Sequence, residues 1–265
     1  MEAWGEKIGQ GRTADVYALG EDRIVKVFRQ PQLLEFEWTV AECLDDSSVP
    51  RPRVYGRQEQ DGMQGIVYER IQGPTMMAQL AARPEEVEAF GRLLARLHAE
   101  LHKAGAGRLP SHKEVLAHGI RRSRALLTEH RERAVLRLLE SLPEGMTLCH
   151  GDFHPDNVMY GQQGPVVIDW MTATRGMPAA DAARTLMLLR HAELPEEMPE
   201  PVQQAVKALR ARLLGAYEAE YLRLSGVSKE ELASWEAPLM AARLGESVPE
   251  RECVRLLELI DERLG

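Results

Sequence analysis

The sequence has few cysteines and no long apolar run. Only three cysteines occur in 265 residues, Cys43, Cys149 and Cys253. They lie far apart, without the close spacing of a zinc site, and their odd number leaves an unpaired thiol. No structural zinc is therefore expected, and a reducing compartment is favoured. No stretch approaches the roughly 18 uncharged apolar residues of a membrane span, and no basic flank with an apolar core opens the chain. We expect a cytoplasmic protein with no membrane partner.

The chain also lacks an excess of positive charge. Its 33 Lys and Arg residues face 41 Asp and Glu residues, which gives a formal net charge of -8. A negative net charge disfavours nucleic acid as a partner and is compatible with cationic substrates. The arginine-rich segment 120–137 is therefore predicted to be solvated helix surface rather than a nucleic-acid patch.

Two common phosphate-binding motifs are absent, because the chain contains neither GxxxxGK[ST] nor a strand-to-helix GxGxxG. It contains instead GQGRTADV at 9–16, where Gly9 and Gly11 lie between two strand-like segments. Backbone N–H groups without a neighbouring side chain can approach a phosphate there. A GxG between strands is also a common tight turn, so this motif alone does not decide.

The segments that are present divide the chain into two parts. Short strand-like segments such as RIVKVF (23–28) dominate first, with one helical stretch at 33–44. Long amphipathic helices follow, beginning with the one that Pro84 opens. A chain of this length is sufficient for one large domain or two modest ones. We predict an α+β protein with a small antiparallel-sheet lobe, residues 1–71, and a larger, mainly helical lobe, residues 72–265.

One strand-like hairpin, NVMYGQQGPVVIDW at 157–170, interrupts the helical part. Asn157 and Asp169 are each six residues from Gln163, so a hairpin closing near Gln163 places them within about one register step. Amide and carboxylate oxygens at one sheet end suit Mg²⁺ completed by water and phosphate oxygens. Asp152, in the preceding HGDFHPDN, lies in a loop that could direct it to the same pocket. The alternative is a polar loop whose groups satisfy one another.

Lys26 occupies the centre of RIVKVF, with large apolar residues on both sides. A lysine there is poorly solvated unless it pairs with an anion. The alternative is a lysine on the solvent-exposed face of the sheet. The helix that follows offers three carboxylates, with Glu37 as the first choice and Glu35 and Glu42 as alternates.

The order of these features has a counterpart in a known family. A Gly-rich hairpin, a strand lysine, a helix glutamate, HGDFHPDN and IDW follow one another as in protein-kinase-like folds. The sequence most resembles the aminoglycoside phosphotransferase and choline kinase family. HGDxHPxN followed by IDW is the most specific segment, and the likeness extends through EFEWTVAECL, GIVYERIQGPTM and the terminal LMAARLGESVPERE. The resemblance implies a two-lobed protein-kinase-like fold over nearly the whole chain.

The resemblance implies a role for each side chain of these motifs. Asp152 matches the catalytic aspartate, which orients the substrate hydroxyl and accepts its proton. Asn157 and Asp169 match the magnesium ligands. Lys26, held by Glu37, matches the lysine that contacts the α and β phosphates of the nucleotide.

The resemblance also implies roles for backbone groups and for supporting residues. The backbone from Gly9 through Gly11 to Thr13 would cover the phosphates, and the Glu69 carbonyl with the Ile71 N–H would form the adenine-binding hinge. His150 and His154 match scaffold residues of the loop, while Asp181, in GMPAADAART, matches a family aspartate that braces the catalytic loop.

The implied function is magnesium- and ATP-dependent phosphorylation of a hydroxyl on a small molecule, and the resemblance does not choose between ATP and GTP. Aminoglycoside, amino-alcohol, sugar and macrolide acceptors all stay open, as does the oligomeric state. Glu246, Glu250 and Glu252 are candidates for recognising a cationic acceptor, or else are surface glutamates.

Two other functions are compatible with a kinase-like fold. A catalytically silent kinase-like protein could bind a nucleotide or metabolite for regulation, but the intact Asp152, Asn157, Asp169 and Lys26 argue against it. A protein kinase would need a peptide platform, and the short span between IDW and PAAD leaves little room for a long activation loop.

Overall fold

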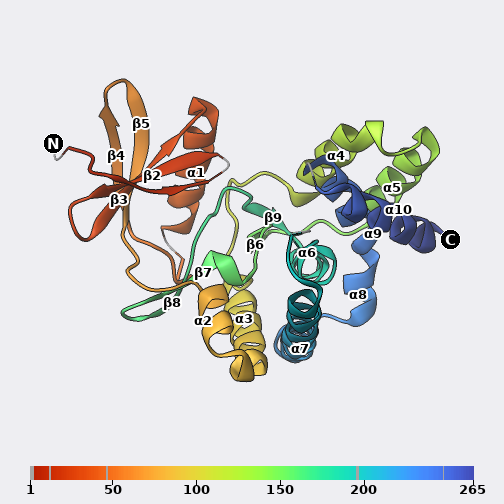
Figure 1. The fold of residues 1–265 in the computed structure, drawn as a ribbon. Helices are drawn as coiled ribbons and strands as arrows, with labels where there is room; N and C mark the ends of the chain where they lie inside the picture. Colours follow the sequence, from red (N-terminus) through yellow and green to blue (C-terminus); the bar gives the residue numbers. More distant parts are fainter. Residues whose placement is uncertain (1–2, 12, 46, 195–196, 247) are drawn as a thin grey trace. The chain divides into compact units, whose positions relative to one another are not determined.

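The structure, a computed structural model, describes residues 3–11, 13–45, 47–194, 197–246 and 248–265. The chain forms two compact units, shown along the sequence in Figure 1. The first comprises residues 1–79 and 155–173, and the second comprises residues 80–154 and 174–265. An antiparallel sheet comes first and helices dominate afterwards, so the predicted α+β class is confirmed. The lobe limits predicted at 1–71 and 72–265 remain a proposal.

The first unit is built on a five-stranded antiparallel sheet in the order β1-β2-β3-β5-β4 (Figure 1). Its strands are β1 (Lys7–Gln10), β2 (Ala14–Leu19), β3 (Arg23–Phe28), β4 (Val54–Gln60) and β5 (Met63–Glu69). Helix α1 (Pro31–Leu44) follows β3 and begins with proline at its first position, where no intrahelical N–H is required. Helix α2 (Met76–Ala82) follows the sheet.

The alternation of side chains along β3 decides which face Lys26 occupies. Val25 and Val27 point into one apolar cluster, whereas Phe28 packs with Leu34 of α1 in another. Since side chains two residues apart share a face of the sheet, Lys26 lies on the same face as Phe28, which is the face that α1 covers. The lysine is therefore directed at a helix rather than at open solvent.

The hairpin predicted at 157–170 is present in the first unit. It consists of β7 (Val158–Gly161) and β8 (Gly164–Val167), paired antiparallel with Val158 opposite Val167. The next step of this register places Asn157 opposite Ile168, whose N–H donates to the Asn157 carbonyl at 2.9 Å. Asp169 is thus one residue from the position facing Asn157, as the spacing predicted.

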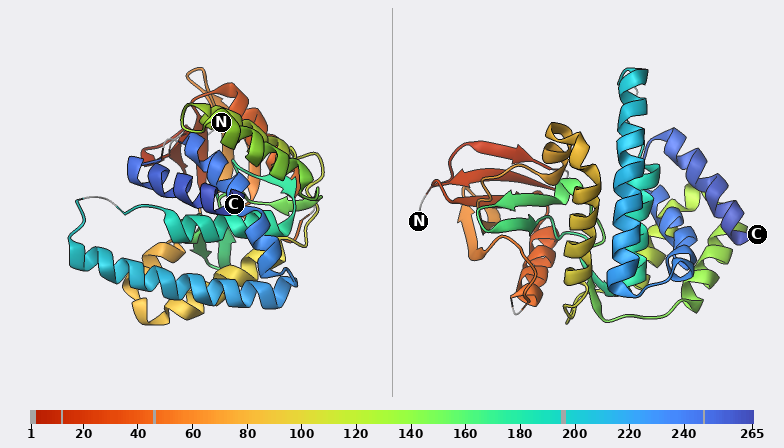
Figure 2. Two further views of the ribbon diagram at one scale, coloured as in Figure 1. Left: turned by 90° about the vertical axis from the view of Figure 1, so that its right-hand side faces the viewer. Right: turned by 90° about the horizontal axis from the view of Figure 1, so that it is seen from below.

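The second unit consists mainly of helices, drawn from two further directions in Figure 2. They are α3 (Val87–Leu101), α4 (His112–Arg122), α5 (Glu129–Ser141), α6 (Pro178–His191), α7 (Glu200–Ser225), α8 (Lys229–Ser234), α9 (Glu236–Arg243) and α10 (Glu250–Leu264). Helices α3 and α7 lie side by side (Figure 2). Gly91 permits this close approach, because a Cβ there would lie 2.6 Å from the Leu213 carbonyl oxygen.

A short two-stranded ladder pairs β6 (Thr147–Cys149), which leads into the HGDFHPDN segment, with β9 (Thr174–Gly176), which precedes helix α6. Helix α6 is buried along almost its whole length. Its small alanine side chains, at 179, 180, 182 and 183, allow neighbouring elements to pack close to the helix backbone. Strand β6 leads into the loop that contains Asp152, and α6 carries Asp181, a member of the polar cluster described below. Within the described ranges, no helix combines the length and apolar character needed to cross a membrane.

Candidate active site

Lys26 and Glu37 form a buried ion pair in the first unit. Lys26 Nζ lies 2.7 Å from Glu37 Oε2 and 2.8 Å from Oε1, and Glu37 Oε1 also accepts a hydrogen bond from the Tyr68 hydroxyl at 2.9 Å. The Glu37 side chain is 5% exposed. The other two glutamates of α1 have different partners: Glu35 binds Arg57, and Glu42 accepts from the Trp38 indole. Of the three carboxylates considered from sequence, Glu37 is the one that contacts Lys26.

Lys26 has a second carboxylate partner, Asp169. The Nζ to Oδ1 distance is 3.1 Å, and both residues belong to the first unit. Burial by itself lowers the pKa of Lys26, but the charges of Glu37 and Asp169 outweigh burial and raise it. The ammonium is therefore held charged between two carboxylates.

Asp169 and Asn157 supply oxygens at the open end of the β7–β8 hairpin. Asn157 is 8% exposed, whereas the Asp169 side chain is 51% exposed. Asp169 also has a φ of 60°, a left-handed conformation that is uncommon for residues other than glycine. Its backbone leaves the strand direction there, and the carboxylate reaches the Lys26 ammonium.

The Gly-rich hairpin joins β1 to β2, and the part that includes residue 12 lies outside the described residues. Gly11 N–H donates to the Ala14 carbonyl at 2.8 Å. Neither Gly9 nor Gly11 has a positive φ. A Cβ at Gly9 would lie 3.4 Å from Val16, and one at Gly11 would lie 3.5 Å from the Ala14 carbonyl, both ordinary contacts. Local conformation and packing therefore do not require glycine at these positions, whereas close approach of a ligand to the backbone would.

The predicted hinge begins at Glu69, the last residue of β5. Glu69 N–H donates to the Arg53 carbonyl, and Arg70 N–H donates in the opposite direction to the Asp22 carbonyl, each at 2.8 Å. In an extended segment, backbone groups two residues apart face the same edge. Residues 70 and 71 lie outside the strand, and the role of the Glu69 carbonyl and the Ile71 N–H as acceptor and donor stays a prediction.

The loop that follows β6 carries Asp152 in the second unit. His154 Nε2 lies 3.5 Å from Asp152 Oδ2, and Asp152 N–H donates to His150 Nδ1 at 3.3 Å. Burial raises the pKa of Asp152, but His154 and the positive charge of Arg184 outweigh burial and lower it to about 2. The carboxylate is ionised at neutral pH and can accept a hydrogen bond.

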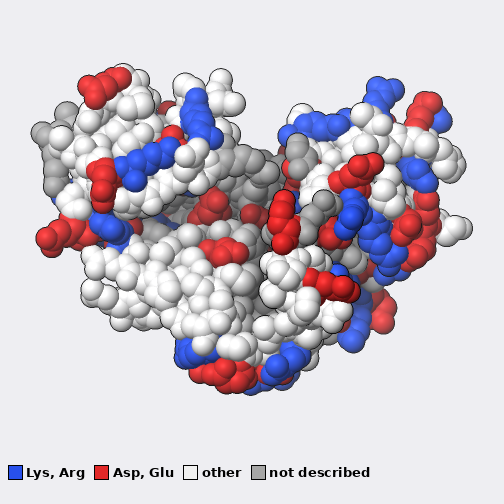
Figure 3. Space-filling view, in the orientation of Figure 1, with Lys and Arg blue, Asp and Glu red and all other residues white. Residues whose placement is uncertain are grey.

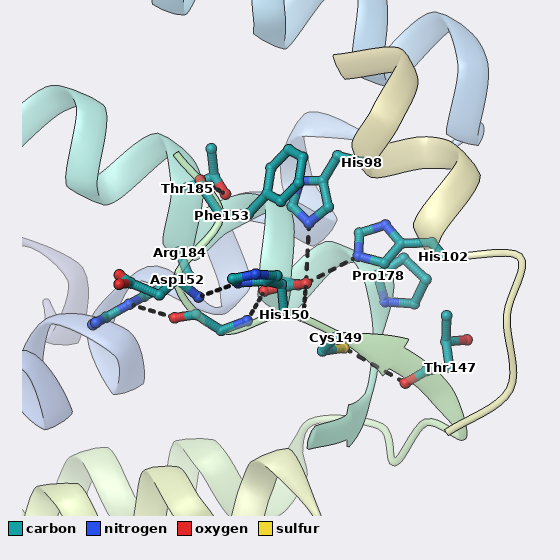
Figure 4. Close-up of polar contacts among 12 residues, drawn as sticks. His98, His102, Thr147, Cys149, His150, Asp152, Phe153, Pro178, Arg184 and Thr185 are labelled. Atoms are coloured by element: carbon teal, nitrogen blue, oxygen red, sulfur yellow. Dashed lines mark hydrogen bonds and ion pairs between the residues drawn. The ribbon is translucent and has the colours of Figure 1, made fainter. Parts of the chain in front are cut away.

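The Asp181 side chain braces this loop by accepting hydrogen bonds from the loop backbone (Figure 4). Its Oδ2 accepts the His150 N–H at 2.6 Å, and its Oδ1 accepts the Gly151 N–H at 2.8 Å. Asp181 is fully buried in the first turn of α6, where the helix dipole favours a negative charge. Burial alone raises the pKa of Asp181, but its hydrogen bonds and two adjacent histidines hold the pKa well below its usual range.

The two histidines complete a buried polar cluster that sequence reasoning missed. Asp181 Oδ2 lies 3.0 Å from His98 Nε2 and 3.2 Å from His102 Nε2. The remaining Nδ1 atoms face the hydroxyls of Tyr217 and Tyr221 on α7, at 2.7 and 2.8 Å. Burial lowers the pKa of His98 to about 4. His98 lies on the buried face of α3, and its hydrogen bonds to residues 83 and 119 positions away had no local signal in the sequence.

The atoms of His98, His102 and Asp181 are also close enough to ligate a metal ion. However, Asp181 Oδ2 additionally accepts the His150 N–H, and each histidine has a tyrosine hydroxyl on its other nitrogen. Hydrogen bonding thus accounts for the short distances, and His98 is fully buried. The cluster supports the loop through these hydrogen bonds.

The three C-terminal glutamates have different surroundings. Glu246 Oε2 accepts from Arg184 at 2.9 Å and from Arg243 at 2.6 Å. Glu252 is 3% exposed, and its Oε1 accepts from Arg243 at 2.9 Å. Both carboxylates are therefore engaged with arginines. Glu252 is buried, so it is not a surface glutamate, whereas recognition of a cationic acceptor by these residues stays a prediction. Glu250 is exposed.

The arginine-rich segment 120–137 has acidic neighbours. Arg131 Nε donates to Asp261 at 2.7 Å, and Arg124 lies 3.8 Å from Glu132. On the face shown in Figure 3, basic and acidic side chains alternate over α4, α5 and α10. This mixture of charges agrees with the solvated helix surface predicted for the segment.

The sequence was compared with protein families and with curated proteins. A family model described as "Phosphotransferase enzyme family" matches residues 4–227. The comparison with curated proteins gave no match.

Solved structures share the fold of this chain. A thermostable mutant of aminoglycoside phosphotransferase APH(4)-Ia, in a ternary complex with ADP and hygromycin B, is 15% identical, with a TM-score of 0.66 over 98% of this chain and 92% of that one. The amicoumacin kinase hAmiN, in complex with AMP-PNP, Ca²⁺ and Ami, is 14% identical, with a TM-score of 0.61 over 98% and 87%. A choline/ethanolamine kinase family protein from Mesorhizobium loti is 15% identical, with a TM-score of 0.61 over 98% and 90%. The predicted kinase-like fold is thereby confirmed.

Proposed function

Because the chain belongs to the phosphotransferase enzyme family, we propose that it transfers the γ-phosphoryl group of ATP to a hydroxyl of a small molecule in a magnesium-dependent reaction. The observation that carries the proposal is the buried Lys26–Glu37 pair with Asp169 on the same ammonium. A lysine held in this way presents a fixed positive charge, which suits the α and β phosphates of a nucleotide. Asp169 is the partner that can exchange this contact for a metal ion, because its side chain is half exposed.

The residues at the hairpin end fit a magnesium ion. Asn157 and Asp169 offer only oxygen ligands, which Mg²⁺ prefers, and few protein ligands leave room for water and phosphate oxygens. The hairpin register brings both residues to one end of the two strands. We assign these two side chains to the metal, which would neutralise charge on the phosphates when bound.

The backbone supports a nucleotide in the same unit. Gly9 and Gly11 are glycines that neither conformation nor packing requires, which favours close approach of phosphates to that hairpin. The Glu69 carbonyl and the Ile71 N–H pair one acceptor with one donor. This pair matches the amino donor and ring-nitrogen acceptor of adenine, which favours ATP over GTP.

Asp152 is assigned to the acceptor hydroxyl. In the transfer, the acceptor oxygen forms a bond to the γ-phosphorus while the bond from the γ-phosphorus to the bridging oxygen breaks. ADP leaves with that electron pair, and the hydroxyl proton passes to the Asp152 carboxylate. Because the transition state of phosphoryl transfer is loose, a strongly basic group is not needed, and a carboxylate with a pKa of about 2 can orient the hydroxyl.

A small-molecule acceptor is supported by the proteins that share the fold. Hygromycin B is the ligand named for one of them, and choline or ethanolamine kinases name the family of another. Glu246 and Glu252 do not favour a polycationic acceptor, since arginines already occupy both carboxylates. The acceptor is therefore best sought in a broad panel of hydroxylated antibiotics and metabolites, including hygromycin B, choline and ethanolamine.

Nucleotide binding is tested by thermal melts of the whole chain. Magnesium with a nonhydrolysable ATP analogue should stabilise the folded state by about 2.7 kcal/mol at 100 times the dissociation constant. Either component alone should stabilise it less, because the metal bridges protein and phosphates. A saturating analogue without any magnesium-dependent shift would contradict the proposed site.

Transfer is tested by mass spectrometry of the acceptor panel incubated with ATP and magnesium. Replacing Asp152 by Asn should lower turnover about 10²- to 10⁴-fold while nucleotide affinity changes far less. Wild-type turnover by Asp152→Asn would refute its assignment. Tight nucleotide binding with no phosphorylated product from any acceptor would favour a regulatory binding protein instead.

A further inference from the structure

Arg184 is a buried cation that reaches the catalytic loop from α6. It is 7% exposed, its Nε donates to the Gly151 carbonyl at 3.2 Å, and its Nη2 donates to Glu246 Oε2 at 2.9 Å. Figure 4 shows its guanidinium beside the Asp152 carboxylate. A planar guanidinium can hold two partners in fixed directions at once. Arg184 thus joins the loop to the 3-10 turn at Leu244–Glu246 that follows α9.

The far end of Arg184 is itself held in place. Glu246 Oε2 accepts a second hydrogen bond from Arg243 Nη1 at 2.6 Å, and Arg243 Nε donates to Glu252 Oε1 at 2.9 Å. Glu252 is almost fully buried in the first turn of α10. A continuous series of charge-assisted hydrogen bonds therefore runs from the loop backbone to α10.

The contact with Gly151 matters for the direction of the Asp152 side chain. The Gly151 carbonyl belongs to the same peptide unit as the Asp152 N–H, which donates to His150 Nδ1. On the other side, Gly151 N–H is held by Asp181, and Gly151 has a φ of 78°. Asp181 and Arg184 together restrain the peptide units on both sides of Gly151, and so restrain the backbone from which Asp152 projects.

We propose that Arg184 is a positioning residue for phosphoryl transfer, which holds the Gly151–Asp152 peptide so that the Asp152 carboxylate is directed at the acceptor hydroxyl. Glu246 and Arg243 hold Arg184 in turn. The role in catalysis rests on the proposed function of Asp152. The restraint on the loop does not depend on it and can be measured separately.

The experiment compares four variants of the full chain. Arg184→Met keeps the apolar part of the side chain and removes the guanidinium fork, that is, the planar group that donates to two partners at once. Arg184→Lys keeps the positive charge without this fork. Glu246→Ala releases the far end and leaves the arginine in place, so it serves if Arg184→Met does not fold. Arg190→Met is the matched control, because Arg190 lies on the same helix and pairs with Glu236 away from the loop.

The first measurement is hydrogen–deuterium exchange of the peptide that covers residues 148–154, followed by mass spectrometry. Arg184→Met and Glu246→Ala should speed exchange of the loop amides about tenfold, and Arg190→Met should leave it as in the wild type. No substrate is needed. Loop exchange in Arg184→Met equal to that of the wild type would overturn the proposal.

The second measurement is steady-state turnover with an acceptor from the panel that the wild type phosphorylates. In Arg184→Met, kcat should fall about 100-fold while KM for magnesium ATP stays within about twofold. Arg184→Lys should stay at least about tenfold below the wild type in kcat. Wild-type kcat in Arg184→Met or Arg184→Lys would refute positioning by the fork. If Arg184→Met speeds loop exchange but the wild type phosphorylates no acceptor, the restraint of the loop by Arg184 is upheld and only the proposed phosphotransferase function is contradicted.

Discussion

His112 should make the stability of the protein depend on pH. It lies at the first position of α4, is 5% exposed, and stacks on Trp235 with ring centroids 6.3 Å apart. Its Nδ1 has no hydrogen-bond partner among the described residues. Burial lowers the pKa of His112 to about 4, from 6.5 in an exposed imidazole.

The sign and the size of the effect follow from this pKa. Because the folded pKa is the lower one, the unfolded chain binds the proton first, and stability falls as the pH drops from 6.5 towards 4. The two pKa values differ by 6.5 − 4 = 2.5, so the free energy of unfolding should fall by about 3 kcal/mol once the pH is below both values. At pH 5 the decrease should be about 2 kcal/mol. Above pH 6.5 the contribution is fully present.

The variant His112→Phe removes the titration and the unpartnered nitrogen. The free energy of unfolding is measured by urea titration with circular dichroism at pH 7 and at pH 5. Its decrease between these two pH values should be about 2 kcal/mol smaller in His112→Phe than in the wild type. At pH 7 the variant should lie within about 1 kcal/mol of the wild type. His118→Gln, on the exposed part of the same helix, is the control and should keep the wild-type loss. An equal loss in His112→Phe and the wild type would refute the reasoning.

Three further substitutions test the supports of the site. Asp181→Asn turns an amide towards backbone N–H groups and histidines inside the protein, and should cost about 3–5 kcal/mol in urea unfolding at neutral pH; a loss below about 1 kcal/mol would contradict the bracing role. Lys26→Met should leave a folded protein whose melting temperature no longer responds to magnesium with an ATP analogue; a retained response would exclude Lys26 from nucleotide binding. Gly65→Ala would place a Cβ 2.5 Å from Val25 Cγ1 and 2.9 Å from the Lys26 carbonyl oxygen. It should cost about 1–3 kcal/mol, and an unchanged urea midpoint would show that β3 and β5 can move apart freely.

Local features of the chain were predictable from sequence. The strand around Lys26, the hairpin at 157–170 and the division into a sheet followed by helices depend on side-chain period and turn residues within one segment. The spacing of Asn157 and Asp169 predicted their register for the same reason, since a hairpin pairs residues at equal distances from its turn. The family followed from motifs of this kind and was confirmed by the family match.

The choice among glutamates lay at the limit of such reasoning. Glu35, Glu37 and Glu42 share one helix, and sequence spacing alone left all three as candidates. The rotation of α1 against β3 decided for Glu37, because packing of Leu34 with Phe28 turns that side of the helix towards the sheet. That rotation depends on how two elements fit together.

The family resemblance implied Asp181 as the brace of the loop that carries Asp152, but only the tertiary structure decided which other side chains support that loop. His98 reaches Asp181 from α3 and His102 from the C-cap of that helix, and the tyrosines that complete the cluster come from α7, 119 residues further along. Arg184 likewise meets Glu246 across 62 residues. Buried polar groups must find partners, but the chain contains many donors and acceptors of the same kind, and only the packing of helices selects among them. The sequence by itself contained the motifs that indicate phosphoryl transfer. The packing of distant helices determined which side chains hold those motifs in position.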